Sequence, residues 1–381
     1  MPNFSGVWNL KEQIQAAGAY RWPGAFPAQR LYAWGLNNAG QLGDGTTVSN
    51  SSPIQVGALT TWEKISAGDF HAAVIKIDGT LWTWGNNGYG RLGTNNTIFR
   101  SSPVQVGALT NWSQASGGNA HTAAVKTDGT LWTWGQNVYG SLGDGTVVRR
   151  SSPVQIGVLT NWAQVSAGRG HTAAVTITGA LYAWGDNLNG RVGDNTTARK
   201  SSPVQIGALT HWSQVTADYN NTAAVTTSGS LYVWGINTNG QVGDGTVISR
   251  SSPVQIGSLT NWSQVAPGGN HTVALKTDGT IWAWGTGPNG ALGDGTVVNK
   301  SSPVQIGLLT NWSQVTANFA WSSAVKTDGT LWVWGSGDSG RLGDGTVVDK
   351  SSPVQIGALT TWHQVSAGQG GGLALTRGQS N

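Results

Sequence analysis

The sequence predicts a seven-bladed β-propeller, and three observations lead to this fold class. A unit of fifty residues recurs without insertion, so that tryptophans return in one register from Trp34 to Trp334 and in a second from Trp62 to Trp362. Each unit carries four strand signals, which is the composition of a propeller blade. The array also starts within one unit and stops within another, so its two ends can complete a single blade.

The four strands of a unit follow from its residue pattern, described here for the second copy. We expect them at Trp62–Gly68, His71–Lys76, Leu81–Gly85 and Pro103–Gly107. Asp78-Gly79 lies between the second and third of these strands and favours a tight hairpin turn. Because a proline at the start of a strand is acceptable at a sheet edge, we expect the fourth strand to be the outermost.

The third strand carries the largest side chains. Trp82 and Trp84 point to the same side of the sheet because successive side chains alternate. The position of Trp82 is Trp or Tyr in all seven copies. A buried aromatic side chain removes about 150–250 Å² from water. We therefore expect the aromatic residues at this position to hold each blade against its neighbour.

The two ends of the array predict how the ring closes. Leu31–Gly35 has the pattern of a third strand, while Trp362–Gly368 and Leu373–Arg377 have those of a first and a second strand. Two strands from each end make one complete blade and leave no open inner edge. The predicted organisation is a separate N-terminal segment and linker, residues 1–30, followed by the propeller, residues 31–381.

Composition limits the function. Only 10% of the residues are charged, and the net charge of +4 is spread over 381 residues, whereas nucleic-acid-binding proteins cluster lysine and arginine on one face. Cysteine is absent, so there is no thiol nucleophile and no thiolate metal site. The sequence shows neither a long apolar run nor the pattern of a signal peptide. We expect no nucleic-acid partner and no membrane insertion.

The sequence offers no recognisable catalytic or metal-binding set. Four histidines share one register with one residue per blade, which spreads them around a ring, so we expect each to bond nearby backbone. The Gly-Asp-Gly triplets supply one carboxylate each, where calcium takes six or more oxygen ligands, and turn chemistry explains them. We expect a protein that is not an enzyme and has no cofactor or metal site. The four histidines are His71, His121, His171 and His271.

The loops that vary most among the copies are expected on one face of the disc, the variable face. The loops after the first and the third strand reach the same rim, whereas the Asp-Gly turns lie on the opposite turn face. Exposed aromatic side chains among amides are typical of protein- or glycan-binding surfaces, while loop tips also vary where nothing constrains them. Phe319 and Trp321 are the predicted hot spot. The predicted binding residues are Asp69, Phe70, Tyr89, Asn119, Tyr139, Arg169, Tyr219, Asn220, Phe319 and Trp321.

The repeated segments resemble the repeat of the regulator of chromosome condensation family. The general pattern of the units is W-G-x-N-x-x-G-x-L-G-D-G, then S-S-P-V-Q-I, then V-x-A-G-x-x-H-T-A-A-V-K-T-D-G-T, over residues 31–378. The resemblance implies a seven-bladed propeller in a family with several unrelated activities. The eponymous member is a nucleotide exchange factor that acts through a wedge inserted in one blade, and the equal length of all copies here argues against that activity. A bacterial relative that inhibits β-lactamases implies that one face of a plain propeller can bind protein.

The segment Phe4–Pro23 resembles a short leader found on tail and virion proteins of phages, where it precedes varied C-terminal modules. The resemblance implies that the segment attaches the protein to a virion. A strap that packs its tryptophans against the propeller is the alternative for this segment. The predicted attachment residues are Phe4, Trp8, Leu10, Ile14 and Trp22.

These observations favour a non-enzymatic phage virion protein, associated with the tail or a fibre. Its propeller would contact other virion proteins or a host surface protein or glycan, and its location would be the phage particle. The first alternative is a stand-alone bacterial binding or inhibitor propeller with an extracellular location. A hydrolase that acts on glycans is a further alternative, which lacks the paired carboxylates that most such enzymes use.

Overall fold

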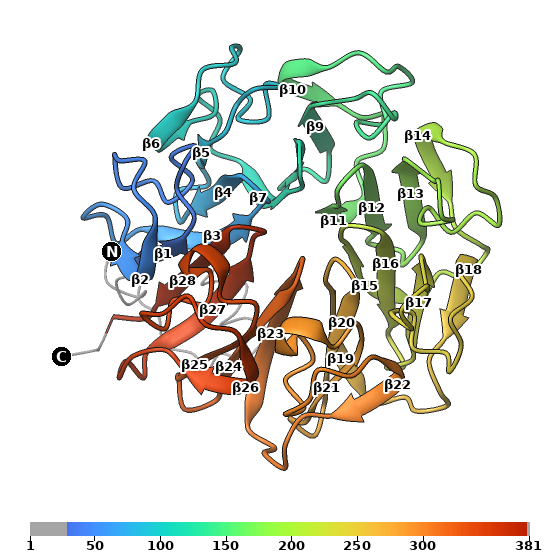
Figure 1. The fold of residues 1–381 in the computed structure, drawn as a ribbon. Coiled ribbons are helices and arrows are strands. Elements are labelled where there is room, and N and C mark those ends of the chain that lie inside the picture. The colour runs from blue at the N-terminus through green and yellow to red at the C-terminus, as the bar shows by residue number, and fades with distance from the viewer. Residues whose placement is uncertain (1–28, 379–381) are drawn as a thin grey trace, which may run out of the picture.

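The computed structural model describes residues 29–378 and confirms a seven-bladed propeller of four-stranded antiparallel sheets around a central axis (Figure 1). The predicted attachment residues, Phe4, Trp8, Leu10, Ile14 and Trp22, lie outside the described residues. The strands of each sheet follow one another outwards from the axis.

Six blades are continuous in the sequence. Blade 1 holds β3 (Trp62–Ala67), β4 (His71–Lys76), β5 (Leu81–Gly85) and β6 (Arg100–Gln105). Blade 2 holds β7 (Trp112–Gly117), β8 (His121–Lys126), β9 (Leu131–Gly135) and β10 (Arg150–Gln155). Blade 3 holds β11 (Trp162–Ala167), β12 (His171–Thr176), β13 (Leu181–Gly185) and β14 (Lys200–Gln205).

The remaining continuous blades repeat this arrangement. Blade 4 holds β15 (Trp212–Ala217), β16 (Asn221–Thr226), β17 (Leu231–Gly235) and β18 (Arg250–Gln255). Blade 5 holds β19 (Trp262–Pro267), β20 (His271–Lys276), β21 (Ile281–Gly285) and β22 (Lys300–Gln305). Blade 6 holds β23 (Trp312–Asn318), β24 (Trp321–Lys326), β25 (Leu331–Gly335) and β26 (Lys350–Gln355).

The closing blade joins the two ends of the chain, as predicted. From the axis outwards it consists of β27 (Trp362–Ala367), β28 (Gly371–Thr376), β1 (Arg30–Gly35) and β2 (Asn50–Gln55). The register between β1 and β28 is unbroken, with Arg30 opposite Thr376 at one end and Gly35 opposite Gly371 at the other. An antiparallel pair formed by strands from opposite ends of the chain therefore fastens the ring.

The outermost strand begins earlier than predicted. In blade 1 it starts at Arg100, which pairs with Gly85, and after a register shift Val104 pairs with Thr83. Pro103 therefore lies in the irregular part of an edge strand, where its missing N–H removes no ladder hydrogen bond. The residues before the proline lack apolar alternation, which is why the sequence pattern indicated a loop.

The apolar core lies between neighbouring blades. Trp84 is fully buried, and its indole N–H donates to the carbonyl oxygen of Gln41 in the preceding blade at 3.0 Å. All seven equivalent tryptophans make this bond, at 2.8–3.1 Å. The Trp82 position, predicted for this role, is only half-buried and packs edge-on against Trp62 of its own blade. Periodicity alone could not distinguish the two aromatic registers, because both repeat identically.

Both ends of the described chain leave from the turn face. The N–H of Gln29 donates to the carbonyl oxygen of Thr60 at 3.0 Å, and that of Arg377 donates to Thr361 at 2.9 Å. Both threonines lie in connections between blades on the turn face. The variable face therefore lies on the opposite side of the disc from both ends of the described chain.

The helices of the described residues are two short 3-10 helices in loops of the variable face, η1 (Pro288–Gly290) and η2 (Asp338–Gly340). No helix within residues 29–378 is long and apolar enough to cross a membrane.

Candidate functional site

The ten predicted binding residues lie on or beneath the variable face, but they differ in exposure. Tyr89 and Tyr139 are 42% and 37% exposed, and Arg169 is also exposed. Asp69 and Trp321 are buried. The other five are half-buried: Phe70, Asn119, Tyr219, Asn220 and Phe319.

Trp321 is not part of the exposed surface, contrary to its predicted place in a hot spot. Its ring is fully buried in the apolar core between blade 6 and the closing blade. The indole N–H donates to the carbonyl oxygen of Gly368 at 2.9 Å, which satisfies its one polar atom. Trp321 occupies the histidine register, and this register points into a blade boundary rather than towards the face. The adjacent Phe319 remains on the face.

The four register histidines link neighbouring blades. The Nε2 atom of His71 lies 2.7 Å from the hydroxyl of Thr122 in the next blade, and that hydroxyl donates to the carbonyl oxygen of Arg91. Since the threonine has one proton to donate, Nε2 of His71 carries the proton of their bond. The equivalent bonds of the other three histidines measure 2.7–2.9 Å. The partner is therefore a side chain of the next blade rather than the nearby backbone that we expected.

The histidines are held neutral. Burial, followed by the neighbouring Arg91, lowers the pKa of His121 to about 4, and burial lowers that of His271 to about 4 as well. Burial also lowers the pKa of His71 and His171 well below the usual value. A neutral histidine with one nitrogen engaged at a blade boundary has a structural role.

Two replacements in the glycine register before these histidines bring polar side chains to the axis. A Cβ atom on Gly68 would lie 2.7 Å from Cε1 of His71 and 2.7 Å from the carbonyl oxygen of Gly118, so a side chain at this position would require both neighbours to shift. Asp218 and Asn318 occupy the glycine register in blades 4 and 6, where Asn221 and Trp321 replace the histidine. Sequence reasoning overlooked these two residues, although their departure from the repeat was a visible signal.

A network of hydrogen bonds joins residues of different blades around the propeller axis on the variable face, a region that we call the channel mouth. The carboxylate of Asp69 in blade 1 accepts from Nδ2 of Asn119 in blade 2 at 2.8 Å. Its other oxygen accepts from Nδ2 of Asn318 in blade 6 at 3.3 Å. The second bond passes over the closing blade. Asp69 therefore ties together three blades, and its buried position reflects this role.

A second set of contacts crosses the mouth through aromatic rings. The ring of Tyr219 in blade 4 meets that of Phe319 in blade 6 edge-on, with centroids 5.7 Å apart. The guanidinium of Arg169 in blade 3 lies 4.0 Å from the centre of the Tyr219 ring. Phe319 has a φ of +32°, a backbone conformation that is unfavourable for a bulky residue. The mouth is thus covered by a rigid and asymmetric set of side chains.

The two acids at the mouth resist ionisation. Burial raises the pKa of Asp69, against the effect of its amide partners and Arg169. Burial, and secondarily the charge of Asp69, raises the pKa of Asp218 well above its usual value. One carboxylate oxygen of Asp218 is buried without a hydrogen-bond partner among the described residues. The two acids therefore neutralise the positive charge of the neighbouring arginines less than their formal charges suggest.

Aromatic and arginine side chains also meet on the outer part of blades 1 to 3. The guanidinium of Arg199 lies 4.4 Å from the centre of the Tyr139 ring and 3.5 Å from Asp186. Arg191 shares the same carboxylate at 3.2 Å. The predictions omitted Arg199 and Phe99 from the binding residues. We define the aromatic–arginine sector, which extends from blade 1 to Tyr219 of blade 4, as Tyr89, Phe99, Tyr139, Arg169, Arg199 and Tyr219.

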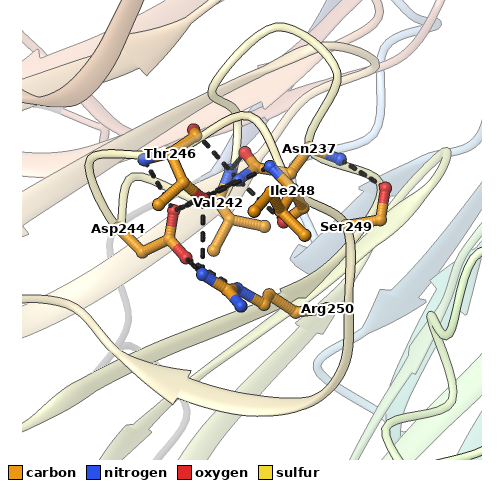
Figure 2. Close-up of polar contacts among 7 residues, drawn as sticks. All are labelled: Asn237, Val242, Asp244, Thr246, Ile248, Ser249 and Arg250. Carbon is orange, nitrogen blue, oxygen red and sulfur yellow. Dashed lines mark hydrogen bonds and ion pairs between the residues drawn. The ribbon is translucent and has the colours of Figure 1, made fainter.

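The loops that carry the face are locked by a central asparagine, as Figure 2 shows for blade 4. Nδ2 of Asn237 donates to the carboxylate of Asp244 and to the carbonyl oxygens of Thr246 and Ile248, each at 3.1 Å. Its Oδ1 accepts from the N–H of Val242 at 2.8 Å. Four other loops use an equivalent asparagine: Asn37, Asn87, Asn137 and Asn187.

The acids of the Gly-Asp-Gly triplets make hydrogen bonds and ion pairs within these loops. Asp244 accepts from the N–H and the hydroxyl of Thr246 and forms an ion pair with Arg250 at 2.5 Å (Figure 2). Its carboxylate is thereby occupied by the loop itself. Over residues 29–378 no group of three or more His, Cys, Asp or Glu side chains is placed to hold a metal ion. What the face offers is stacking area, guanidinium donors and amides on a rigid frame.

Comparison with known proteins agrees with this architecture. The model of the regulator of chromosome condensation (RCC1) repeat matches residues 29–75, 78–125, 128–175, 178–225, 228–275, 278–317 and 328–375. A second model of the same repeat matches five segments between residues 62 and 291. No match was found among curated protein sequences.

Solved structures share the fold at low sequence identity. Human WBSCR16 is 21% identical with a TM-score of 0.84, over 93% of this chain and 100% of that one. Yeast RCC1 (Prp20), solved with Kap60 bound to it, is 18% identical with a TM-score of 0.83, over 100% and 95% of the two chains. The structure of Prp20p from Saccharomyces cerevisiae, reported with its binding to Gsp1p and histones, is 19% identical with a TM-score of 0.78, over 98% and 95%.

Proposed function

Because the chain belongs to the regulator of chromosome condensation repeat family, we propose that it is a non-enzymatic propeller that binds another protein through its variable face. The observation that carries this proposal is the contact of Arg169, Tyr219 and Phe319 across the channel mouth. The strands and turns of the blades repeat a common framework, whereas this set of three side chains occurs once. Aromatic and arginine side chains dominate the binding energy of protein interfaces.

The rigidity of the face supports the same proposal. The asparagine-centred loops and the channel-mouth contacts hold the aromatic rings in place before any partner arrives. A preorganised surface loses less conformational entropy on binding. The similar yeast propeller structures, reported with Kap60 and with Gsp1p and histones, support protein as the class of ligand.

We further propose that the protein works in a phage particle as a tail- or fibre-associated component. The low content of charged residues and the resemblance of Phe4–Pro23 to phage leaders support this location. The described chain enters the propeller at the turn face. An attachment made through residues 1–30 would therefore leave the variable face available to another virion protein or to a host surface protein or glycan.

Two experiments test the proposal. Mass spectrometry of purified particles should find the chain at a constant ratio to a known tail protein, and its absence from particles would end the virion proposal. A stand-alone bacterial binding protein is the outcome in which the chain is absent from particles but still captures a partner.

The binding face is tested by partner capture with the purified protein. Tyr139→Ala and Arg169→Ala should each weaken capture of the partner about tenfold or more, which corresponds to the loss of a hot-spot contact. Ile177→Ala is the matched control, because Ile177 is 71% exposed on the turn face. Equal loss of capture in the control and in the face variants would contradict this placement.

A further inference from the structure

Charged residues are distributed unevenly over the variable face. The loops and outer-strand starts of blades 1–3 hold eight Lys or Arg against four Asp, a formal charge of +4. Those of blades 4–6 and the closing blade hold four Lys or Arg against seven Asp, a formal charge of −3. The first group comprises Arg91, Arg100, Arg149, Arg150, Arg169, Arg191, Arg199 and Lys200 with Asp69, Asp144, Asp186 and Asp194. The second comprises Arg250, Lys300, Arg341 and Lys350 with Asp44, Asp218, Asp244, Asp294, Asp338, Asp344 and Asp349.

The charges that remain exposed lie on opposite sides of the ring. In five blades a basic residue at the outer strand pairs with the acid of its own loop, and these pairs cancel. What remains on blades 2 and 3 is exposed Arg149 and Arg169, whereas Arg199 shares the carboxylate of Asp186 with Arg191. What remains on blade 6 is exposed Asp349, together with Asp338, whose side chain is 73% exposed and whose carboxylate lies 3.9 Å from the guanidinium of Arg341. In a ring of seven, blade 6 is diametrically opposite the boundary between blades 2 and 3, and Figure 1 shows β26 across the disc from β10 and β14.

This arrangement is complementary to itself. Consider a two-fold axis that lies in the plane of the face, along the border between the two charge halves. This axis relates one copy to a second copy whose variable face meets that of the first. It then places the basic half of each copy over the acidic half of the other. Such an isologous interface needs one surface that matches its own image. The perimeter of the same face carries apolar side chains that are more than half exposed, including Val148, Val298 and Val348, and exposed apolar surface of this kind is typical of interaction sites.

We propose that two copies of the chain associate through their variable faces, with blades 2 and 3 of each copy against blade 6 of the other. The proposal rests on the proposed function of this face and names one of its partners. The rigid loops and the aromatic–arginine sector supply the contact area. The separated charges fix the orientation of the two copies relative to each other. If one copy were turned by half a turn about the disc axis, like charges would lie over one another.

Sedimentation velocity of the full chain over a range of concentrations tests the association. We expect a monomer–dimer equilibrium with a Kd that rises at least about tenfold between about 50 mM and about 500 mM NaCl, because salt screens exposed charges. A chain that stays monomeric at all concentrations would overturn the self-association. It would leave the proposed function standing if partner capture still depended on Tyr139 and Arg169.

A charge swap tests the orientation. Arg149→Glu places like charges against Asp338 of the second copy twice in the symmetric dimer, and Asp338→Lys does the same against Arg149. Each variant alone should be monomeric at concentrations where the unchanged chain is dimeric. An equimolar mixture of the two variants should form a heterodimer, because both contacts become attractive again. A mixture that stays monomeric, or single variants that dimerise normally, would overturn the proposed arrangement.

Matched controls on the turn face separate this effect from net charge. Glu63→Lys and Arg377→Glu reverse charges of the same size at exposed positions away from the variable face. Both should dimerise as the unchanged chain does. Loss of the dimer in these controls would mean that total charge, rather than the facing halves, governs association, and would overturn the proposal.

Discussion

The indole N–H of Trp34 donates to the carbonyl oxygen of Arg341 at 2.9 Å, joining residues that are 307 positions apart. Trp84 makes the equivalent bond to Gln41 at 3.0 Å inside the continuous part of the ring. The boundary that brings the two ends of the chain together is therefore built like the other blade boundaries. Closure depends on the same buried tryptophan that seals each pair of blades.

Removing the strands that complete the ring should open it. Deletion of residues 362–381 takes away β27 and β28, which leaves β1 paired with β2 alone, frees its inner edge and exposes Trp34. We expect a lower melting temperature and soluble oligomers or aggregate in light scattering, because apolar surface and strand edges become free. A truncated chain that stays monomeric with an unchanged melting temperature would contradict the role of this closure.

Acid should destabilise the fold through the buried histidines. Their folded pKa lies below the unfolded value near 6.5, so the unfolded chain takes up protons first as the pH falls. Stability is complete above about pH 6.5 and is lost towards pH 4, on the order of 3 kcal/mol each for His121 and His271, whose pKa values are about 4. Urea unfolding at a series of pH values measures this loss.

The control for the histidine effect is His271→Asn, which introduces the residue that blade 4 carries at Asn221. This variant should lose part of its stability at pH 7 because its bond to Ser322 changes, but it should show a shallower loss of stability between pH 6.5 and pH 4. An unchanged slope would show that His271 does not take part in the acid response.

Asp218→Asn should stabilise the protein at neutral pH. The folded pKa of Asp218 is raised above its unfolded value, so its ionised form opposes folding at pH 7, and this cost disappears as the pH falls towards 4. We expect a gain of about 1 kcal/mol in the free energy of unfolding at pH 7 and little difference at pH 4. Asp338→Asn, at an exposed position, is the control and should change stability little. A loss of stability in Asp218→Asn at pH 7 would contradict this reasoning.

At position 319, a glycine variant should be more stable than an alanine variant, which is the reverse of the usual order. Phe319→Ala removes the contact with Tyr219 but keeps the unfavourable φ, so it should cost about 0.5–1.5 kcal/mol. Phe319→Gly also removes the contact but relieves the backbone, since glycine adopts positive φ without penalty. We expect the glycine variant to be about 1 kcal/mol more stable than the alanine variant in urea unfolding. Alanine equal to or better than glycine would show that the backbone at Phe319 is not strained.

The repeat determined most of the fold from sequence alone. Tryptophans at fixed steps and turn residues between short apolar runs place four strands in each unit, and the phase at the two ends specifies the closing blade. These features are local or periodic, and a single sequence displays them. The same periodicity also led to a wrong prediction, that the Trp82 position holds the blades together. The Trp82 and Trp84 registers repeat equally, and only packing shows that Trp84 seals the blade boundary.

The tertiary structure decided what happens at the axis. Asp69, Asn119 and Asn318 belong to three blades and meet only because the ring curves them together, and the same curvature places Phe319 against Tyr219. Trp321 is prominent in the sequence, yet it points into a blade boundary. Sequence order determines the blades because six of them form from neighbouring residues and the seventh from the two ends of the array. The character of the face depends on contacts between residues up to 249 positions apart, which arise only from the closed ring.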